Sequence, residues 1–364
     1  MLRSFTLKNF RCFQNLTLEP LERVNLIAGK NNVGKTSLLE AIFIFINPNN
    51  PESLFQVNRL RGLTRISKIE DIEEMKGFFF DQDVDKIIEL SSIEENNLQR
   101  SLKIRFPESG ESQLSIFEPL DPLVDKDNEI FQANESLTTE DRSYDTIVLD
   151  YQDPTSKTGR SRTIVRADGR LLRSSRRQKF PLGIYLTTST RSPREDAERF
   201  SNLERVGRQD EVLTTLRLLE PRLQRLTLLV VEREPIIHGD IGMSELVPLP
   251  LMGEGIGRLL SIILAIANAK GGTILIDEIE NGLHYSVMTD VWKAIADAAR
   301  RVDVQIFATT HSQECIRAAH EAFENTEQYD FRYHRLEQVK DEIRAVTYDQ
   351  ETLATSDEMN LEMR

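Results

Sequence analysis

Asp277 and Glu278 are adjacent acidic residues that follow the apolar run TILI in the segment GGTILIDEIENGLH. The apolar run predicts a buried strand. Two carboxylates at the end of such a strand can form a helix cap or a solvated turn. They can also do chemistry, because one carboxylate can ligate Mg²⁺ while the next accepts a proton from water as a general base.

A phosphate-binding pattern upstream favours the chemical interpretation. The segment GKNNVGKTS, Gly29 to Ser37, fits G-x-x-x-x-G-K-[ST], with an apolar run before it and helical spacing after it. Glycines let backbone N–H groups surround phosphate oxygens, Lys35 can reach the β- and γ-phosphates, and the Thr36 hydroxyl can ligate Mg²⁺. The alternative is a simple Gly-Lys turn before a helix. If the strand before Asp277 neighbours this loop, Asp277 reaches the metal and Glu278 lies beside the γ-phosphate.

His311, in the segment FATTHS, also follows an apolar run. A lone histidine at a strand end is often only a hydrogen-bonded structural residue. The order of phosphate loop, acidic strand and His-bearing strand favours a γ-phosphate contact instead.

The elements that must position these residues alternate along the chain. An α/β fold with a parallel sheet is predicted, because strand-like and helix-like segments alternate from about residue 180 onward. Between 51 and 180, short alternating segments predict an inserted antiparallel sheet with an Ala-Asp-Gly hairpin turn at 167–169, and 119–143 is a candidate mobile loop. The segments DFRYHRLE and EIRAVTYD predict a closing hairpin.

Composition fits a globular protein inside the cell. The chain has 364 residues, 39% hydrophobic and 29% charged, with a net charge of -13 and only two cysteines, Cys12 and Cys315. No apolar run reaches the roughly 18 residues that a membrane span needs. The N-terminus has no signal-peptide pattern, so a cytoplasmic location is expected.

Together these motifs resemble the ABC-type ATPases of the RecF, SMC and OLD-like group, and in detail the standalone AAA-family ATPases related to OLD and to antiphage systems. The resemblance rests on FTLKNFRCFQNLTLE…VNLIAGKNNVGKTSLLEAI, on LPLMGEGIGRLLSIILAIANAKGGTILIDEIENGLH and on FATTHS. It covers residues 1–46 and 180–350. It implies an ABC-type P-loop NTPase head with a mixed central sheet, an antiparallel β insertion and a helical signature subdomain.

Site roles follow from the resemblance by position. Lys35, Glu278 and His311 would be catalytic, and Thr36 and Asp277 would hold Mg²⁺. The nucleotide-binding positions, on the phosphate loop, the signature segment MGEG and the following D-loop, would be Gly29, Asn31, Asn32, Gly34, Lys35, Thr36, Ser37, Gly253, Glu254, Gly255 and Asn281, with Gly282 beside the last. The usual signature serine is absent, and a glutamate lies among the glycines. No pattern fixes the family's metal-contacting glutamine, for which Gln82 is a guess.

The resemblance also implies organisation and partners. Residues 1–50 and 181–350 would form the head, 51–180 an inserted antiparallel β or lid region, and 351–364 a tail. Two heads would enclose two ATP molecules head to tail. An OLD-like nuclease domain is missing after His311, so no nuclease activity is expected and the effector, a nuclease or a toxin, would be a separate protein.

A basic segment lies within the insertion. Residues 157–179 carry two Lys and seven Arg against one Asp. Such a stripe can bind DNA or can be a solvated hairpin face. The first candidates for DNA contact are Arg162, Arg166, Arg170 and Arg173, and Arg191 is a candidate phosphate contact.

Three functions remain open from sequence. The first is an ATP-hydrolysing sensor or scaffold of an antiphage or DNA-maintenance system that works as a homo-oligomer. The second is a RecF-like repair protein whose ATP-closed dimer clamps duplex DNA. The third is the nucleotide-binding half of a transporter. The RecF-like N-terminal segment and the missing signature serine count against this third function.

Overall fold

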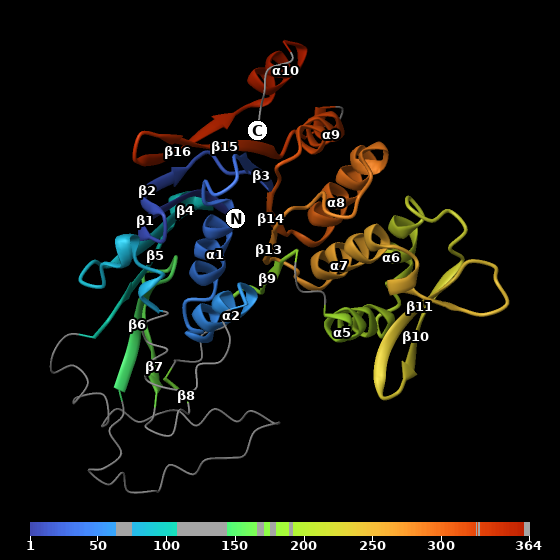
Figure 1. The fold of residues 1–364 in the computed structure, drawn as a ribbon, viewed down its shortest axis with the longest axis horizontal. Helices are drawn as coiled ribbons and strands as arrows, with labels where there is room; N and C mark the ends of the chain where they lie inside the picture. The colour runs from blue at the N-terminus through green and yellow to red at the C-terminus, as the bar shows by residue number, and fades with distance from the viewer. Residues whose placement is uncertain are drawn as a thin grey trace, which may run out of the picture.

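The computed structural model describes residues 1–62, 75–107, 144–165, 171–174, 180–188, 192–324, 326 and 328–359. The predicted mobile loop at 119–143 and the predicted turn at 167–169 lie outside these residues. The described chain forms two large sheets with a helix between them and a lobe of helices to one side (Figure 1).

A six-stranded mixed sheet forms the centre of the fold. Its strands, in spatial order, are β16 (Glu342–Tyr348), β15 (Phe331–Val339), β3 (Val24–Gly29), β14 (Gln305–Thr309), β13 (Thr273–Ile276) and β9 (Gly183–Leu186). All neighbours pair in parallel except β15 and β16, which form the predicted hairpin. Every residue of β3 is buried, as predicted for a central strand covered on both faces. The carboxyl ends of the parallel strands meet at one edge, where ligands bind in open α/β sheets.

Helix α1 (Lys35–Ile46) follows β3 and lies between the two large sheets. Its residues from Ser37 to Ile46 are all buried, and most of them are apolar. It packs on Phe5 and Leu7 of one sheet and on Leu275 and Phe307 of the other, within one hydrophobic core. The first turn of α1 is therefore held rigidly at the edge where β3 ends.

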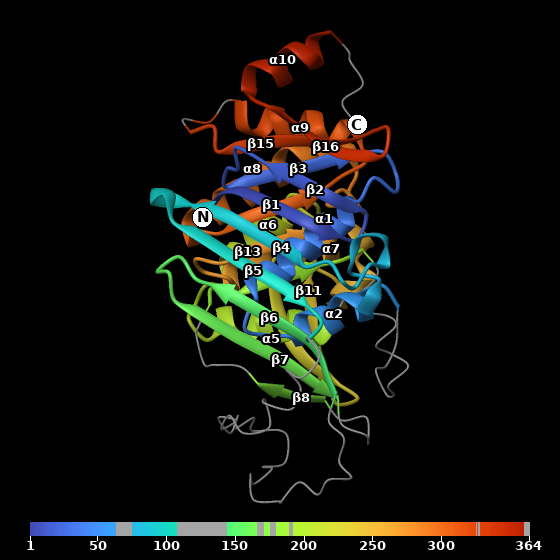
Figure 2. The same cartoon turned by 90° about the vertical axis from the view of Figure 1, so that its left-hand side faces the viewer.

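A seven-stranded antiparallel sheet covers the other side of α1, and Figure 2 shows its strands lying side by side. In spatial order they are β2 (Phe13–Leu18), β1 (Leu2–Phe10), β4 (Ile88–Glu94), β5 (Gln99–Arg105), β6 (Tyr144–Gln152), β7 (Thr158–Val165) and β8 (Leu171–Ser174). The antiparallel strands predicted between 51 and 180 are present, but their sheet also contains β1 and β2, which pair with each other and with β4. One sheet thus joins strands from both sides of the boundary predicted at residue 50.

The remaining helices are α2 (Glu52–Leu60), α5 (Pro193–Glu204), α6 (Gln209–Leu216), α7 (Glu254–Asn268), α8 (Met288–Val302), α9 (Gln313–Glu324) and α10 (Gln350–Glu358). Helices α5, α6 and α7 form a lobe with a three-stranded sheet of β10 (Arg225–Val231), β11 (Glu234–Asp240) and β12 (Val247–Pro248). A second core of hydrophobic side chains joins this lobe to β3, β13 and β14.

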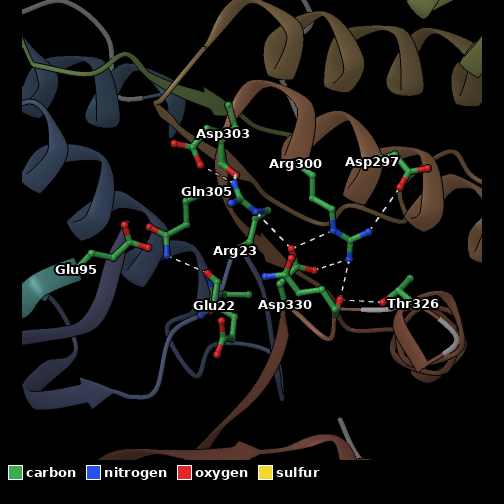
Figure 3. Close-up of polar contacts among 12 residues, drawn as sticks. Glu22, Arg23, Glu95, Asp297, Arg300, Asp303, Gln305, Thr326 and Asp330 are labelled. Carbon is green, nitrogen blue, oxygen red and sulfur yellow. Dashed lines mark hydrogen bonds and ion pairs between the residues drawn. The ribbon is translucent and has the colours of Figure 1, made fainter.

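Polar contacts fix the amino ends of the central strands, at the opposite edge from the phosphate loop (Figure 3). The guanidinium groups of Arg23 and Arg300 both contact the buried carboxylate of Asp330, at 3.3 and 2.5 Å. The Gln305 side chain accepts a hydrogen bond from the Leu2 amide and donates one to the Leu2 carbonyl. These contacts hold the starts of β3, β14 and β15 in register, which in turn fixes where each strand ends.

Candidate functional site

The phosphate loop requires glycine at two positions. Gly29 and Gly34 have φ angles of 145° and 99°, which L side chains rarely adopt. A Cβ on Gly29 would lie 2.6 Å from the Leu336 carbonyl oxygen, and one on Gly34 would lie 2.6 Å from the Phe13 ring and 2.7 Å from Cys12 Sγ. The loop can therefore curl tightly against β15 and β2 only with these residues.

Lys35 lies at the centre of this loop. Its Nζ donates hydrogen bonds to the Gly29 and Lys30 carbonyl oxygens, at 2.7 and 3.1 Å. Partial burial lowers the pKa of Lys35, while Asp277, Glu278 and Glu280 act in the opposite direction. The ammonium group thus lies in a polar, partly enclosed space beside acidic side chains, where an anionic ligand would compensate its charge.

The sequence-distant acid Asp277 meets the loop directly. Thr36 Oγ1 donates to Asp277 Oδ2 at 3.0 Å and lies 3.3 Å from Oδ1, across 241 residues of sequence. Asp277 is buried, directly after β13. A hydroxyl and a carboxylate in contact at this position are oxygen ligands of the kind that Mg²⁺ prefers.

Thr309, at the end of β14, joins the two adjacent acids. Its hydroxyl donates to Asp277 Oδ1 at 2.5 Å and accepts a hydrogen bond from the Glu278 amide at 2.8 Å. Thr309 is fully buried. One hydroxyl therefore orients the carboxylate of Asp277 and the backbone of Glu278 together.

Glu278 has a left-handed backbone, with φ of 48°, which is uncommon for a residue with a side chain. Its side chain is 42% exposed, whereas Asp277 is buried, so Glu278 is the more solvent-accessible of the two acids that line the cleft. The local conformation thus separates two adjacent carboxylates, one held inward and one held outward.

Arg258 of α7 stabilises that conformation from behind. Its buried guanidinium donates to the Asp277 carbonyl at 2.6 Å, to the Glu278 carbonyl at 3.4 Å and to the Thr187 carbonyl at 2.9 Å. The ends of β9 and β13 are therefore tied to the helix that begins at the signature segment.

His311 contacts two carboxylates. Its Nδ1 lies 3.2 Å from Glu280 Oε1 and 3.8 Å from Glu278 Oε1, and its backbone N–H donates to Glu280 Oε1 at 2.9 Å. The imidazole is half exposed. Glu280 thus holds His311 next to Glu278 while one side of the ring stays open to solvent.

A cleft of about 980 Å³ lies over Lys35, Thr36, Asp277 and Glu278, and His311 is not among the described residues that line it. Its lining residues are Arg11, Cys12, Asn31, Asn32, Gly34, Lys35, Thr36, Ser37, Arg61, Gly77, Phe79, Asp81, Gln82, Asp277 and Glu278. Gln82, the guess for the metal-contacting glutamine, therefore faces the same cleft as Lys35. The volume of the cleft suits a nucleotide-sized ligand.

Two arginines at the cleft converge on one buried acid of α1. Glu40 forms ion pairs with Arg11 and Arg61, both at 2.6 Å, and Arg61 also donates to Ser37 Oγ at 3.1 Å. Burial raises the pKa of Glu40, and the hydrogen bond and charge of Arg61 together with the charge of Arg11 oppose this shift. This cluster fixes the cationic side of the cleft against the start of α1.

The signature and D-loop residues lie elsewhere. Gly253, Glu254, Gly255 and Asn281 are not among the described residues that line the cleft. Instead the start of α7 packs on the D-loop, since a Cβ on Gly255 would lie 2.4 Å from the Gly282 carbonyl oxygen. A Cβ on Gly253 would meet no atom within 4 Å, so this glycine borders open space.

The candidate DNA-binding arginines are only partly within the described chain. Arg162 lies on β7 opposite Ser174, and Arg173 lies on β8 opposite Thr163, at adjacent positions of an antiparallel ladder. Arg166, Arg170 and Arg191 lie outside the described residues. DNA binding stays a prediction.

Residue types and spacing did not predict Thr309, Arg258 and Glu280, nor the cluster of Arg11, Arg61 and Glu40. Arg258 had a visible signal, since it is the one charged residue after Glu254 in the apolar helix α7. Thr309 precedes His311 by two positions, but only the fold shows that its hydroxyl turns toward Asp277. The only sequence signal for Glu280 is that it is the third acidic residue in the segment DEIE.

Replacing Thr309 by valine is expected to lower turnover of nucleoside triphosphate about tenfold to a hundredfold, because the Glu278 amide loses its acceptor and Asp277 loses a donor. KM should change much less, since Lys35 and the loop are untouched. Thr309→Ser keeps the hydroxyl and should retain most of the activity. Steady-state phosphate release measures both variants, and equal kcat for wild type and Thr309→Val would contradict this role.

No helix in the described part of the chain combines the length and the apolar character that crossing a bilayer requires.

Comparison with known proteins places this geometry in a family. Residues 24–317 match the family model described as "AAA domain, putative AbiEii toxin, Type IV TA system". An ATP/GTP phosphatase of Helicobacter pylori is 26% identical over 330 residues, covering 87% of this chain and 86% of that protein. The DNA replication and repair protein RecF of Pseudoalteromonas translucida is 57% identical over 42 residues, which is 12% of each protein.

Solved structures share the fold. A crystal structure of an Smc head bound to the C-winged helix domain of ScpA has a TM-score of 0.52 at 14% identity, covering 97% of this chain and 99% of that chain. An Smc head domain with an extended coiled coil, bound to the C-terminal domain of ScpA derived from Pyrococcus furiosus, has a TM-score of 0.51 at 11% identity, covering 99% of each. The chain therefore belongs to the AAA-domain family that its residues 24–317 match, and it is a P-loop ATPase of the ABC, RecF and SMC-like type with the fold of an SMC head.

Proposed function

We propose that this protein binds and hydrolyses ATP and that two copies close head to tail around two ATP molecules. The observation that carries the proposal is the contact between Thr36 and Asp277, 241 residues apart in sequence, in a cleft that also contains Lys35 and Glu278. The name of the Helicobacter pylori relative, an ATP/GTP phosphatase, supports the same reaction.

The donor set fits Mg²⁺ bound together with a nucleotide. In the parts of the chain that the structure covers, no group of three or more His, Cys, Asp or Glu side chains could hold a metal by itself. Thr36 and Asp277 offer one hydroxyl and one carboxylate, and Mg²⁺ usually combines such ligands with phosphate oxygens and water. When bound, the ion would neutralise charge on the phosphates.

The side chains then divide the chemistry among them. Lys35 would leave the carbonyls of its own loop to bind phosphate oxygens, while the loop amides at the start of α1 bind others. Glu278, turned outward by its backbone, would accept a proton from the attacking water. His311, held by Glu280, would contact the γ-phosphate from the side.

The second copy would complete the site. The open space beside Gly253 and the N-terminus of α7 suit a phosphate presented by a partner. The carboxylate of Glu254 has the same sign of charge as a phosphate, so we expect it to weaken this contact between copies.

The biological role follows the family description. We propose a sensor or scaffold of an antiphage or DNA-maintenance system that acts through a separate effector, a nuclease or a toxin, because the matched family is described in terms of toxin–antitoxin systems. The short RecF match favours an ATP-dependent DNA-binding repair protein as the second candidate. Retention of duplex DNA that requires ATP and falls steeply with salt would support that candidate. Co-purification of one effector would support the first.

The test of ATP binding compares two lysines of one loop. Lys35→Ala should abolish ATP binding and phosphate release, because the lysine side chain reaches the phosphates. Lys30→Ala, an exposed neighbour whose backbone carbonyl alone contacts Lys35, should leave both intact. Calorimetric titration with ATP and Mg²⁺, with phosphate release alongside, measures the pair. Equal ATP affinity in wild type and Lys35→Ala would overturn the proposal.

A further inference from the structure

Tyr185 carries a buried hydroxyl group that no residue of the described chain satisfies. It lies on β9, the edge strand of the central sheet, which pairs with β13. Its phenol oxygen is enclosed by protein and makes no hydrogen bond with any residue that the structure describes. Buried polar groups are almost always hydrogen-bonded, and a hydroxyl left without a partner destabilises the fold. We therefore looked for a partner that becomes available in another state of the molecule.

The central sheet directs Tyr185 to the face that α1 covers. Tyr185 pairs with Leu275 of β13, and both side chains belong to the core that includes α1. The tyrosine ring packs on Phe43 of α1, with 5.8 Å between the ring centroids. Asp277 follows Leu275 by two positions, so its side chain lies on the same face, where it contacts Thr36 at the start of α1. Tyr185 and Asp277 therefore project from neighbouring strands to the same side of the sheet.

These two residues are close enough for a tyrosine side chain to connect them. Neighbouring strands lie about 4.8 Å apart and rise about 3.3 Å per residue, so Cα atoms two positions out of line are about 8 Å apart. The Asp277 amide donates to the Leu186 carbonyl at 2.9 Å, so the pairing of the two strands continues to this point. Thr309 reaches Asp277 from β14 on the other side. Asp277 thus has a hydroxyl-bearing neighbour on each flanking strand, and Thr309 is the one that is hydrogen-bonded to it.

The acids around the phenol indicate which of them can become its partner. Burial raises the pKa of Tyr185 well above its ordinary value, and the negative charges of Asp277 and Glu40 act in the same direction, so the hydroxyl keeps its proton and can donate it. Glu40 already has both carboxylate oxygens in ion pairs with arginines. Asp277 Oδ2, in contrast, accepts its hydrogen bond from Thr36, whose hydroxyl is itself a proposed ligand of Mg²⁺. Asp277 is therefore the acid that loses a donor when the site is filled.

We propose that Tyr185 is a positioning residue, whose hydroxyl donates a hydrogen bond to Asp277 when Thr36 turns to Mg²⁺. This inference rests on the proposed function, because it needs nucleotide and Mg²⁺ to bind at Thr36 and Asp277. Asp277 then has two hydroxyl donors in both states, Thr36 and Thr309 in the empty site and Tyr185 and Thr309 in the filled one. The unpaired phenol destabilises the empty site and becomes satisfied on binding, which favours the filled state.

The first test replaces Tyr185 by phenylalanine, which removes the hydroxyl and keeps the ring. Without ligand, the thermal midpoint of Tyr185→Phe should equal or exceed that of wild type, because an unpaired buried hydroxyl is lost. With Mg²⁺ present, the dissociation constant of ATP should rise about tenfold, the usual effect of losing a hydrogen bond to a charged group. In EDTA the ATP dissociation constant should not change. Tyr333→Phe, on the opposite face of the central sheet, should leave the ATP dissociation constant unchanged in both conditions.

Thermal scanning and calorimetric titration with ATP measure these quantities. A lower midpoint for ligand-free Tyr185→Phe would show that the hydroxyl serves the empty fold instead. Equal ATP affinity of Tyr185→Phe and wild type with Mg²⁺, or an equal loss of affinity in EDTA, would exclude the metal-dependent contact. Each of these results overturns the inference while ATP binding by wild type, and with it the proposed function, is retained. Absence of ATP binding by wild type would end both proposals.

The second test detects the contact by fluorine NMR, without any assay of hydrolysis. The chain has seven tyrosines, and in protein labelled with 3-fluorotyrosine the signal of residue 185 is the one that is missing from Tyr185→Phe. This signal should shift when Mg²⁺ and a non-hydrolysable ATP analogue are added together, because the fluorine lies beside the hydroxyl that gains a partner. The analogue in EDTA should shift it much less. A signal that stays in place when Mg²⁺ and the analogue are bound would refute the contact.

Discussion

Glu278→Gln is expected to reduce ATP hydrolysis about 10²- to 10⁴-fold while ATP still binds. Glutamine keeps the size of the side chain and cannot accept the proton from water. The left-handed backbone of residue 278, held by Thr309 and Arg258, should persist, because neither contact involves the carboxylate. The variant should therefore accumulate an ATP-bound head-to-tail assembly.

Phosphate release and ATP-dependent molar mass measure this outcome in the same samples. Glu204→Gln, the same substitution at the exposed end of α5, should behave as wild type. Lys35→Ala should already fail to bind ATP, so it should neither hydrolyse ATP nor accumulate the assembly. If Glu278→Gln hydrolysed ATP at the wild-type rate, Glu278 would not be the base, whatever its position.

Arg258→Met is expected to lower the free energy of unfolding by about 3 kcal/mol, because two buried carbonyl oxygens and one part-buried carbonyl oxygen lose their donor. Methionine retains the apolar stem and so isolates the hydrogen bonds. The carbonyls belong to Thr187, Asp277 and Glu278, so the variant should also lose most of its hydrolytic activity.

Urea denaturation with activity assays at the same temperature tests this. Arg217→Met is the matched control, since Arg217 also donates to two carbonyls, those of Leu223 and Gln224, but at the surface. Arg217→Met should lower the free energy of unfolding by well under half of the amount lost in Arg258→Met. Equal destabilisation by both substitutions would show that burial of the Arg258 contacts is not what matters.

The sequence predicted the strands and helices near the site because their periodicity is strong. The continuous apolar runs at β3, β13 and β14, each ending in a polar motif, predicted parallel strands whose ends meet, and the structure brings Thr36 and Asp277 into contact. The inserted antiparallel strands were also predicted. Their sharing of one sheet with β1 and β2 was not, because strand pairing depends on tertiary contacts that alternation does not encode.

The supporting residues were harder to predict for a different reason. A buried hydroxyl such as Thr309, or an arginine such as Arg258, acts through the direction of one side chain toward backbone atoms far away in sequence. Residue type and spacing fix the element that carries such a group but leave its partner undetermined. The ion pairs of Glu40 with Arg11 and Arg61 show the same limit, since three segments contribute one charge each.

The pairing of β3 with β14 and β15 has a consequence for biosynthesis. Asn25 and Ile306, in contact across these strands, are separated by 281 residues. At about 5–20 residues per second, a ribosome needs on the order of tens of seconds to make the intervening chain. Until then the phosphate loop has no acidic partner and β3 has an unpaired apolar edge. Nucleotide can therefore assist folding only after the chain through Thr309 has emerged from the ribosome.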